Sequence, residues 1–478
     1  MPNDEYEIER SWAAEPLFYK APHPPAMSPR NYQFAGTEYA LARDHVIFGD
    51  APGLGKTAQC ILVSNAIKAR RTLAVVPASL RLNWEREIWQ WSTIPNVKTH
   101  AVLKARDGIP PWAHWVIISY DMLRNKDLLA AILDHHWDHL VLDEGHYLKD
   151  PKGNQRIRPI CAEDGVASVS GRISLATGTL MPNQPIECYN AVRLLDWDAI
   201  DGASLDEFRN YYYDFGEGFI TTWDKKKKCY IQKRSKAVRN VPRNLDDLRD
   251  RLRSRVMVRR LKEQVLTELP DRQWHMFPLV ETAAMKKALG HSGWDAVRQM
   301  HEMAEDEFDG SIPIDGAVST ARRLLGEAKA KPMSDYVLQL LQEGVEKIVV
   351  SAWHHTVLDV LYDALASAGL VYMDGNTSPL AKQEAVDAFQ NDDKVRVILG
   401  QMMPLSKGWT LTAAQDVVLC EPYWVPGENE QFLDRVHRYG QEGDMVIGHV
   451  PVVPDSLDER VLASVIRKGT NVQIALDG

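Results

Sequence analysis

The chain has 478 residues, of which 45% are hydrophobic and 25% charged, and its formal net charge is −9. This composition is typical of a globular protein with about three domains, or with fewer large α/β units. The negative net charge argues weakly against a nucleic-acid binder, yet it allows a local basic track. No apolar run approaches the roughly 18 residues of a membrane helix, and the first residues lack a signal-peptide pattern. We therefore expect a cytoplasmic protein with no membrane partner.

Cysteine and histidine positions give no pattern of a metal site. The five cysteines are scattered and never spaced Cys-x-x-Cys, which disfavours a disulfide framework or a zinc ribbon. His135, His136 and His139 lie close together in the sequence, but they lack Cys or carboxylate ligands in a recognisable pattern. We interpret them as residues near the start of a strand.

The expected elements begin with a proline-containing segment, residues 1–28, which we interpret as a loosely ordered lead-in. After it, short apolar runs rich in β-branched residues recur, each followed by a loop and a helical pattern. Near-continuous apolar runs suit parallel strands buried on both faces. They lie at 46–48, 73–76, 116–118, 140–142 and 173–175, and again at 348–350, 371–373, 397–399 and 417–419. The alternation predicts an α/β fold with two doubly wound, RecA-like parallel-sheet lobes.

Between these two sets of strands, the sequence is rich in charge and in helical pattern. We expect helical insertions at about 200–255 and 278–335, with the lysine run 225–228 in a hairpin or loop. Leu269, Pro270 and Asp271 form a plausible hinge, because proline biases its predecessor away from helix. The first lobe is expected at 29–268 and the second at 269–478.

A glycine-rich loop follows the first predicted strand. Residues 49–57 read GDAPGLGKT and lead into a helical pattern, which is the strand–loop–helix context of a phosphate-binding loop. Gly53 and Gly55 would let backbone N–H groups close on phosphate oxygens, while the helix N-terminus adds a positive field. Lys56 adds a charge, and Thr57 can ligate Mg²⁺. Asp50 stands where the strict pattern has its first glycine; the alternative is a glycine-rich turn that caps a helix.

Two carboxylates follow the strand predicted at 140–142. Asp143 and Glu144 would lie beside the phosphate loop, because carboxyl ends of parallel strands share one edge of the sheet. Asp143 would hold Mg²⁺ through water, and Glu144 would orient or deprotonate the attacking water. In isolation, such a pair is more often a helix N-cap.

Longer segments occur in a fixed order along the chain. They are RNYQ at 30–33, VVPASL at 75–80, IISYDML at 117–123, DEGH at 143–146, TGT at 177–179, RRLK at 259–262 with Leu269–Pro270, DGNTS at 374–378 and QFLDRVHRYGQ at 431–441. Together they resemble the Swi/Snf-type DNA translocases of helicase superfamily two over residues 28–465. The RRLK segment is the most diagnostic, because it resembles a linker peculiar to that family.

The sequence departs from the family pattern in three places. Lys407, Gly408 and Trp409 stand where the family usually has Gly-x-Gly-Leu-Asn, Leu180 replaces a proline, and Ala51–Pro52 replaces Glu-Met. These changes leave the ATP chemistry intact and bear on how tightly hydrolysis couples to movement.

The resemblance implies site residues of four kinds, with ATP and Mg²⁺ as cofactors. The ATP-binding residues are Arg30, Gln33, Asp50, Gly53, Leu54, Gly55, Lys56, Thr57 and Gln431. The catalytic residues are Lys56, Asp143, Glu144 and the arginine fingers Arg435 and Arg438, with Thr57 and Asp143 at the metal. The residues that couple ATP state to movement are His146, Thr177, Thr179 and Gly408. The nucleic-acid contacts are Ser79, Arg81, Ser119, Tyr120, Thr377 and Ser378, for which helix capping and loop polarity are the alternative.

These expectations lead to a monomeric, DNA-stimulated ATPase that moves along double-stranded or forked DNA, remodels forks or protein–DNA complexes, or anneals strands. One alternative is a strand-separating DNA or RNA helicase with the same ATPase, against which the RRLK linker argues. Another is a nucleotide-dependent binding module with little turnover, against which the intact Glu144, Arg435 and Arg438 argue.

Overall fold

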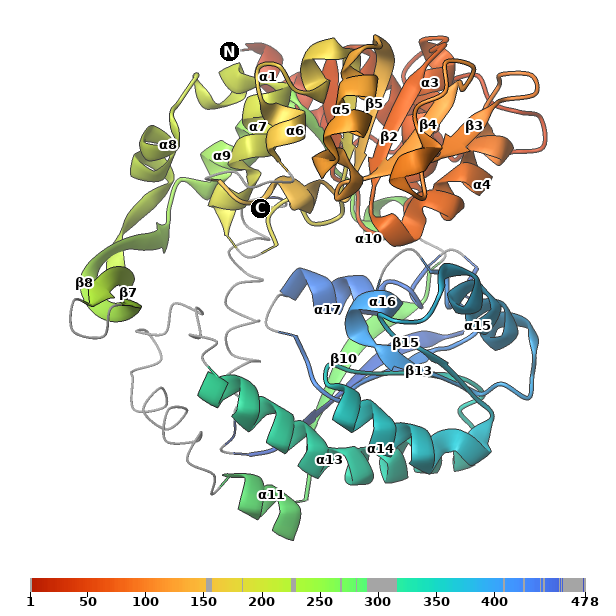
Figure 1. The fold of residues 1–478 in the computed structure, drawn as a ribbon, viewed down its shortest axis with the longest axis vertical. Coiled ribbons are helices and arrows are strands. Elements are labelled where there is room, and N and C mark those ends of the chain that lie inside the picture. The colour runs from red at the N-terminus through yellow and green to blue at the C-terminus, as the bar shows by residue number, and fades with distance from the viewer. Residues whose placement is uncertain are drawn as a thin grey trace. The chain divides into compact units, whose positions relative to one another are not determined.

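The computed structural model (Figure 1) describes the chain except for residues 1, 152–156, 183, 225–228, 267–268, 281, 290–315, 407–408, 424–425, 439, 442, 455, 457, 459–475 and 477–478. The chain divides into two compact units. Unit 1 comprises Met1–Tyr212, Arg243–Thr267 and Val472–Gly478, and unit 2 comprises Tyr213–Pro242 and Glu268–Asn471. Within the described part, no helix is both long and apolar enough to cross a bilayer.

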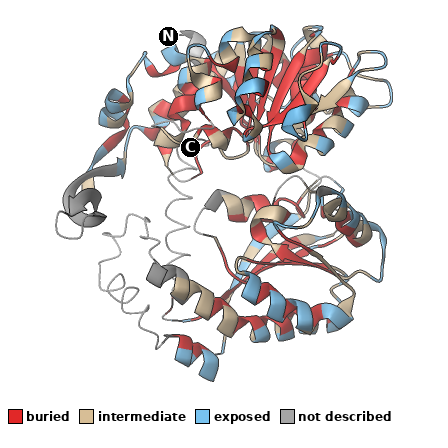
Figure 2. Ribbon diagram, in the orientation of Figure 1, coloured by how far each residue is buried: buried red, intermediate tan, exposed pale blue. Residues whose placement is uncertain are grey.

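Unit 1 is built on a seven-stranded, all-parallel sheet with the order β3-β4-β2-β5-β6-β1-β9. The strands are β1 (His45–Phe48), β2 (Thr72–Val76), β3 (Thr99–Ala101), β4 (Trp115–Ser119), β5 (Trp137–Asp143), β6 (Ser170–Ala176) and β9 (Met257–Val258). The five strands predicted in the first half are all present, and β3 and β9 are additional short strands. The central strands are buried on both faces, as their apolar sequences require (Figure 2).

Helices of unit 1 lie on both faces of this sheet (Figure 1). The helices of the unit are α1 (Pro2–Ser11), α2 (Asn31–Leu41), α3 (Lys56–Ala66), α4 (Arg81–Trp91), α5 (Lys126–Leu133), α6 (Arg158–Cys161), α7 (Tyr189–Leu195), α8 (Leu205–Tyr212), α9 (Leu245–Arg255) and α10 (Lys262–Val265). One core joins β1, β2 and β4 to α3 and α4 through Val46, Cys60, Val76, Trp84 and Ile117. This core fixes the start of α3 against the end of β1.

The N-terminal segment is more ordered than we expected. Residues 2–11 form α1, and Ser11 at its end is buried and accepts a hydrogen bond through its backbone oxygen from the N–H of Arg259 at 2.8 Å. The expectation of a loose lead-in over 1–28 is wrong for this part. Pro2 lies in the first helical turn, where its missing N–H costs no hydrogen bond, and the next proline is Pro16.

Unit 2 is built on a six-stranded, all-parallel sheet with the order β10-β15-β14-β11-β13-β12. The strands are β10 (Asp271–Pro278), β11 (Ile348–Ala352), β12 (Leu370–Met373), β13 (Val397–Gln401), β14 (Asp416–Leu419) and β15 (Met445–Val452). The helices are α11 (Ala283–Leu289), α13 (Gly316–Gln342), α14 (His355–Leu365), α15 (Pro379–Asn391), α16 (Met402–Leu405) and α17 (Pro426–Leu433). All four strands predicted in the second half are present, so the predicted fold of two parallel-sheet α/β lobes is confirmed.

The first predicted insertion is not helical throughout. Helices α8 and α9 flank an antiparallel hairpin made of β7 (Tyr213–Asp224) and β8 (Cys229–Pro242), which forms a separate two-stranded sheet. The run from Phe219 to Trp223 is β-branched and aromatic, a composition that favours strand over helix. The lysine run 225–228 lies outside the described residues. In the second predicted insertion, α11 and the start of α13 are helical, and residues 290–315 are not described.

Candidate functional site

The glycine-rich loop joins β1 to α3 in a conformation that needs glycine. Gly53 and Gly55 have φ angles of 90° and 69°, in the left-handed region that side chains disfavour. Gly55 caps the N-terminus of α3, so N–H groups of the first turn that have no acceptor within the helix face the loop. A Cβ atom at position 55 would lie 2.4 Å from Nε2 of Gln33. The loop can therefore close tightly only with glycine here.

Lys56 extends back over this loop. Its Nζ donates to the backbone oxygen of Asp50 at 2.8 Å and to that of Ala51 at 3.3 Å. Thr57 follows in the first turn of α3 and is half-buried. The ammonium group, the helix N-terminus and the loop amides together form a cradle suited to an anion such as a phosphate group.

The predicted glutamine motif lies against the same loop. Oε1 of Gln33 accepts from the backbone N–H of Arg30 at 2.9 Å, while its Nε2 donates to the backbone oxygen of Leu54 at 3.4 Å. The Gln33 side chain is buried. Thus Arg30, Gln33 and Leu54, which were predicted from distant motifs, are brought together beside the cradle.

Asp143 ends β5 close to Lys56. Its Oδ2 accepts from Nε1 of Trp84 at 2.7 Å, and its Oδ1 accepts from the backbone N–H of Glu144 at 2.9 Å. Burial and the adjacent Glu144 charge raise the pKa of Asp143 to about 6, against the lowering effects of the Trp84 hydrogen bond and of Lys56. A carboxyl whose pKa is raised by burial and by a neighbouring acid beside a basic loop is a candidate functional group.

Glu144 has a strained backbone, with φ 53° and ψ 57°. Such a left-handed conformation is rare outside glycine and is concentrated at functional sites. Oε2 of Glu144 lies 3.2 Å from Nδ1 of His146, a pair that is ionic when the imidazole is protonated. The predicted catalytic and coupling residues of this segment are thus neighbours.

The Thr-Gly-Thr segment adjoins the glycine-rich loop. The backbone N–H of Thr177 donates to the oxygen of Phe48 at 3.0 Å, and the backbone N–H of Thr179 donates to Oγ1 of Thr177 at 3.1 Å. A Cβ atom at Gly178 would lie 2.7 Å from Pro52 and 3.4 Å from Nζ of Lys56. Thr177 and Thr179 therefore lie beside the cradle, while Gly408, the fourth predicted coupling residue, is outside the described residues.

Asp50 is a predicted ATP contact whose side chain is engaged within the protein, and ATP contact by this residue stays a prediction. Its side chain is fully buried, and both of its carboxylate oxygens accept from Arg260. This carboxylate therefore points into the protein, where an arginine compensates the charge that would otherwise repel a phosphate. The RRLK motif gave no sign in the sequence that Arg260 pairs with Asp50 of the glycine-rich loop.

The predicted nucleic-acid contacts of unit 1 separate into two pairs. Ser79 and Arg81 lie near the surface after β2, and Nη1 of Arg81 donates to the backbone oxygen of Val102 at 2.6 Å. Ser119 and Tyr120 are buried, with 2% and 1% of their surface exposed. The Tyr120 hydroxyl donates to the backbone oxygen of Asp143 at 2.6 Å, so it supports the acidic strand end. Their burial leaves little side-chain surface for direct contact, and nucleic-acid contact by Ser119 and Tyr120 stays a prediction.

The predicted nucleic-acid contacts of unit 2 have local roles. Oγ1 of Thr377 donates to Oδ1 of Asp374 at 2.9 Å and accepts from the Asp374 N–H at 3.0 Å. Oγ of Ser378 accepts from the N–H of Ala381 at 3.2 Å and caps α15. Helix capping, the alternative considered for these residues, is observed; nucleic-acid contact stays a prediction.

Gln431, Arg435 and Arg438 lie at the end of α17 and in the turn after it. Gln431 and Arg435 are buried. The guanidinium of Arg438 donates from Nη1 to Oγ1 of Thr410 at 3.2 Å and from Nε to the backbone oxygen of Asp434 at 3.2 Å. The turn thus holds the predicted fingers in a defined local geometry within unit 2.

The residues predicted at the metal fit a cation that keeps most of its water. Among the described residues, no group of three or more His, Cys, Asp or Glu side chains could hold a metal ion. Thr57 and Asp143 offer one hydroxyl and one carboxylate beside the cradle. Mg²⁺ is commonly held in this way, by one or two protein oxygens together with water and phosphate oxygens.

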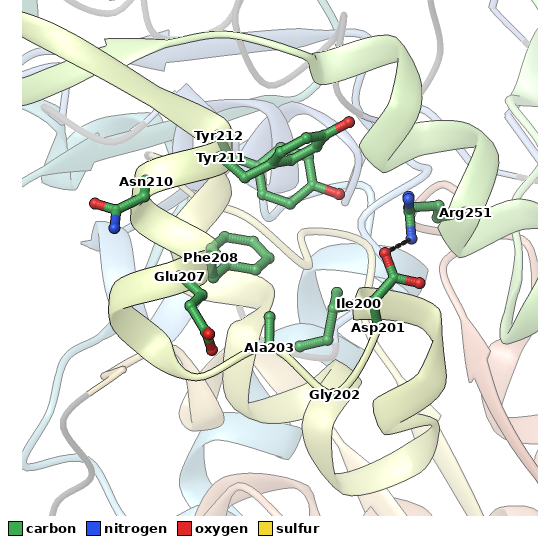
Figure 3. Close-up of a pocket in the computed structure, with 10 residues that line it drawn as sticks. All are labelled: Ile200, Asp201, Gly202, Ala203, Glu207, Phe208, Asn210, Tyr211, Tyr212 and Arg251. Carbon is green, nitrogen blue, oxygen red and sulfur yellow. Dashed lines mark hydrogen bonds and ion pairs between the residues drawn. The ribbon is translucent and has the colours of Figure 1, made fainter.

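A separate pocket of about 520 Å³ lies elsewhere in unit 1 (Figure 3). Phe208 and Tyr212 of α8 contribute aromatic rings to its wall, and Asp201 is 2.7 Å from Arg251 of α9 at its edge. None of the predicted site residues lines this pocket.

Two family models match the chain. The model of the SNF2-related domain matches residues 32–305, and that of the helicase conserved C-terminal domain matches residues 331–440. The first match alone covers more than half of the chain and includes the glycine-rich loop, the acidic strand end and the RRLK segment.

Curated relatives align with most of this chain. SWI/SNF-related matrix-associated actin-dependent regulator of chromatin subfamily A-like protein 1 of Xenopus tropicalis is 29% identical over 437 residues, which are 90% of this chain and 43% of the relative. DNA annealing helicase and endonuclease ZRANB3 of Bos taurus is 28% identical over 465 residues, which are 94% of this chain and 40% of the relative. The chain spans about two fifths of the length of these relatives.

A solved structure also matches. The Sulfolobus solfataricus SWI2/SNF2 ATPase core in complex with dsDNA aligns with a TM-score of 0.44 and 18% identity, over 96% of this chain and 99% of that chain.

Proposed function

Because this chain belongs to the SNF2-related family of ATPases in the helicase superfamily, we propose that it couples ATP hydrolysis to movement along double-stranded DNA. The family inferred from the motifs is confirmed by the match. One observation carries the proposal: Lys56, Gln33 and the Asp143–Glu144 pair surround one glycine-rich loop at the edge of the unit 1 sheet.

The cradle suits the triphosphate of ATP. The amides of the loop and the first turn of α3 would bind phosphate oxygens, with Lys56 as a point charge. Mg²⁺, held by Thr57 and through water by Asp143, would neutralise charge on the phosphate oxygens. Glu144, directly after β5, would orient the attacking water or accept its proton.

Arg435 and Arg438 of unit 2 are the proposed arginine fingers. An arginine that contacts the γ-phosphate stabilises the transition-state charge and contributes on the order of 10³–10⁵ in rate. If unit 2 supplies these groups, hydrolysis requires closure of the two units on ATP. Closure and reopening would then convert each turnover into motion.

Double-stranded DNA is the proposed track, and the names of the relatives support it. One relative is named a DNA annealing helicase and endonuclease. Ser79, Arg81, Thr377 and Ser378 are the proposed backbone contacts. Contacts to phosphates position a protein without reading sequence, which a motor requires, and they make binding salt-dependent. Fork remodelling and strand annealing belong to the same proposal.

The test is the rate of phosphate release with double-stranded DNA, single-stranded DNA, forked DNA or RNA. We expect the strongest stimulation by double-stranded or forked DNA, and displacement of the third strand of a DNA triplex without separation of the duplex. Separation of the duplex strands would favour the helicase alternative. ATP binding with no stimulated phosphate release would favour a binding module and contradict the motor.

We also propose that the active form is a monomer in the cytoplasm. Sedimentation of the purified protein with and without DNA tests the first part, and localisation of a tagged chain tests the second. A stable dimer at micromolar concentration would contradict the monomer.

A further inference from the structure

We infer that Arg259 and Arg260 are positioning residues for the ATP site: the RRLK segment holds the glycine-rich loop, the glutamine-motif helix and the Thr-Gly-Thr segment in register. This inference rests on the proposed ATP hydrolysis and adds to it the part of unit 1 that sets the shape of the cradle.

Arg260 binds Asp50 through a buried, two-pronged contact. Nε of Arg260 is 2.9 Å from Oδ1 of Asp50, and Nη2 is 2.6 Å from Oδ2. The backbone N–H of Arg260 also donates to Oδ1 at 3.0 Å. Both side chains are fully buried. Because the guanidinium is planar and rigid, this arrangement fixes the direction of the loop at Asp50 as well as its distance.

The same guanidinium reaches the two helices beside the loop. Nη2 of Arg260 donates to Oε1 of Gln59 on α3 at 2.8 Å, and Nη1 donates to the backbone oxygen of Tyr32 on α2. Gln59 in turn donates from Nε2 to Oδ2 of Asp50 at 2.8 Å. Tyr32 directly precedes Gln33, whose side chain lies against Gly55. The hydrogen bond from Arg260 to Tyr32 therefore anchors α2 next to Gln33.

Gly36 makes room for this network in α2. A Cβ atom at this position would lie 2.5 Å from Nη2 of Arg260 and 2.2 Å from Oε1 of Gln59. A side chain there would displace the guanidinium.

Arg259 links the loop to the Thr-Gly-Thr segment. Its Nη1 donates to the backbone oxygen of Gly49 at 2.8 Å and lies 3.5 Å from that of Gly178. Backbone hydrogen bonds join the same two segments. The N–H of Gly49 donates to the backbone oxygen of Val258 at 2.8 Å, and the N–H of Ala51 donates to the backbone oxygen of Arg260 at 2.9 Å. The short strand β9 thus extends the sheet so that both arginines point at the site.

Stability alone does not account for two arginines here. A buried ion pair contributes little net stability compared with apolar residues of similar volume, because both charges lose their hydration. Its donors and acceptors do, however, impose one geometry on the groups they join.

The experiment compares Arg260→Lys with Arg172→Lys. Arg172 also donates to carbonyl oxygens at α2, those of Ala40 and Arg43, but at the far end of that helix from the loop. ATP affinity is measured by equilibrium binding without DNA, kcat and KM by phosphate release, and unfolding by a thermal scan. We expect Arg260→Lys to lower kcat/KM for ATP by about 10- to 100-fold, because the cradle shifts relative to the nucleotide. We expect Arg172→Lys to change it by less than about threefold.

Two further variants keep the test decisive if Arg260→Lys folds poorly. Arg259→Lys retains the charge but loses the planar donor, so we expect it to weaken ATP binding in the same direction. Asp50→Asn combined with Arg260→Lys should be no worse than the more damaging single change, since the two residues act as a unit. The inference is overturned if Arg260→Lys and Arg259→Lys keep the wild-type ATP affinity and kcat, or if ATP affinity falls equally in Arg172→Lys. Neither outcome bears on the choice between translocase and helicase, which the DNA experiments decide separately.

Discussion

The indole N–H of Trp84 donates to Oδ2 of Asp143 at 2.7 Å, although the tryptophan lies on α4 and the aspartate ends β5. Trp84 itself is 1% exposed. A tryptophan at this position therefore does more than fill the core, because it provides one of the two hydrogen bonds that hold the carboxylate beside Lys56.

This hydrogen bond predicts a pH effect on activity. The pKa of Asp143 is raised to about 6 by burial first and by Glu144 second, and the Trp84 hydrogen bond opposes that rise. Because the proposed metal role of Asp143 needs its ionised carboxylate, kcat/KM for ATP should fall as the pH drops through about 6. Trp84→Phe removes the donor, so the acid limb should move to higher pH. A pH profile of phosphate release measures this, and an unchanged limb would contradict the assignment of that limb to the pair Asp143 and Glu144.

The raised pKa also predicts how stability depends on pH. A carboxyl with a raised pKa in the folded state binds its proton more tightly there than in the unfolded chain. Its contribution to the free energy of unfolding is present below the ordinary value of 3.8 and is lost as the pH rises through about 6. Asp143→Asn should therefore gain stability relative to wild type between pH 4 and pH 7. Urea unfolding at both pH values tests this. The control is Asp127→Asn at an exposed position of α5, and an equal gain in the free energy of unfolding in both variants would contradict the raised pKa of Asp143 as the cause.

Lys56→Ala should abolish ATP turnover while the fold persists. The lysine contributes its charge at the cradle, and its two hydrogen bonds are to backbone oxygens of a loop that Arg260 also holds. Phosphate release and a thermal scan are the measurements, and Lys98→Ala, an exposed lysine of the same unit, is the control. Turnover at the wild-type rate would remove the phosphate-loop assignment.

Gly55→Ala should weaken ATP binding beyond its effect on stability. At a φ of 69°, an alanine costs about 1–2 kcal/mol in backbone strain. Gly202→Ala is a matched control, because its φ is also 69° but a Cβ atom there meets nothing within 4 Å. Both variants should lose similar stability, whereas only Gly55→Ala displaces Gln33. Equal ATP affinities in the two variants would show that the Gln33 contact is unimportant for binding.

Arg438→Ala should reduce kcat by about 10³-fold or more while much of the ATP affinity remains. Thr410→Val removes the hydroxyl that accepts from Arg438 and should cause a smaller loss of kcat. Arg323→Ala, on the exposed side of α13, serves as the control. Single-turnover hydrolysis and equilibrium ATP binding separate the two effects. If affinity and rate fell together, Arg438 would have a structural role instead.

The sequence predicted the central strands because those strands have the strongest local signal. Nine runs of apolar, β-branched residues became nine parallel strands, most of them buried and only β12 largely half-buried. Other strands carry no such signal: β9 has two residues, and β10 reads DRQWHMFP, with most of its side chains facing solvent at the edge of a sheet. Their pairing depends on long-range packing that no local window contains.

For the candidate site as well, local motifs were predicted from the sequence and long-range contacts were not. The loop, Gln33 and the Asp143–Glu144 pair were predicted because each lies in a contiguous motif. Asp50 and Arg260 are 210 positions apart in the sequence, and neither motif indicates that its residue pairs with the other. The burial of Ser119 and Tyr120 was missed for a related reason: a motif identifies residue types, whereas exposure depends on what packs over them.

Unit 1 is drawn from three separated stretches of chain. Strand β9 reaches the sheet only after the excursion through the β7–β8 hairpin, and Arg253 donates to the backbone oxygen of Leu476 at 2.7 and 3.0 Å. During synthesis on a ribosome, the first 212 residues therefore emerge without β9 and without the two arginines that contact their glycine-rich loop. The contacts of Arg259 and Arg260 with this loop can form only after the hairpin has been translated. The Leu476 contact can form only after all of unit 2 has been translated. A nascent chain should thus acquire its ATPase activity late, long after its glycine-rich loop has left the exit tunnel.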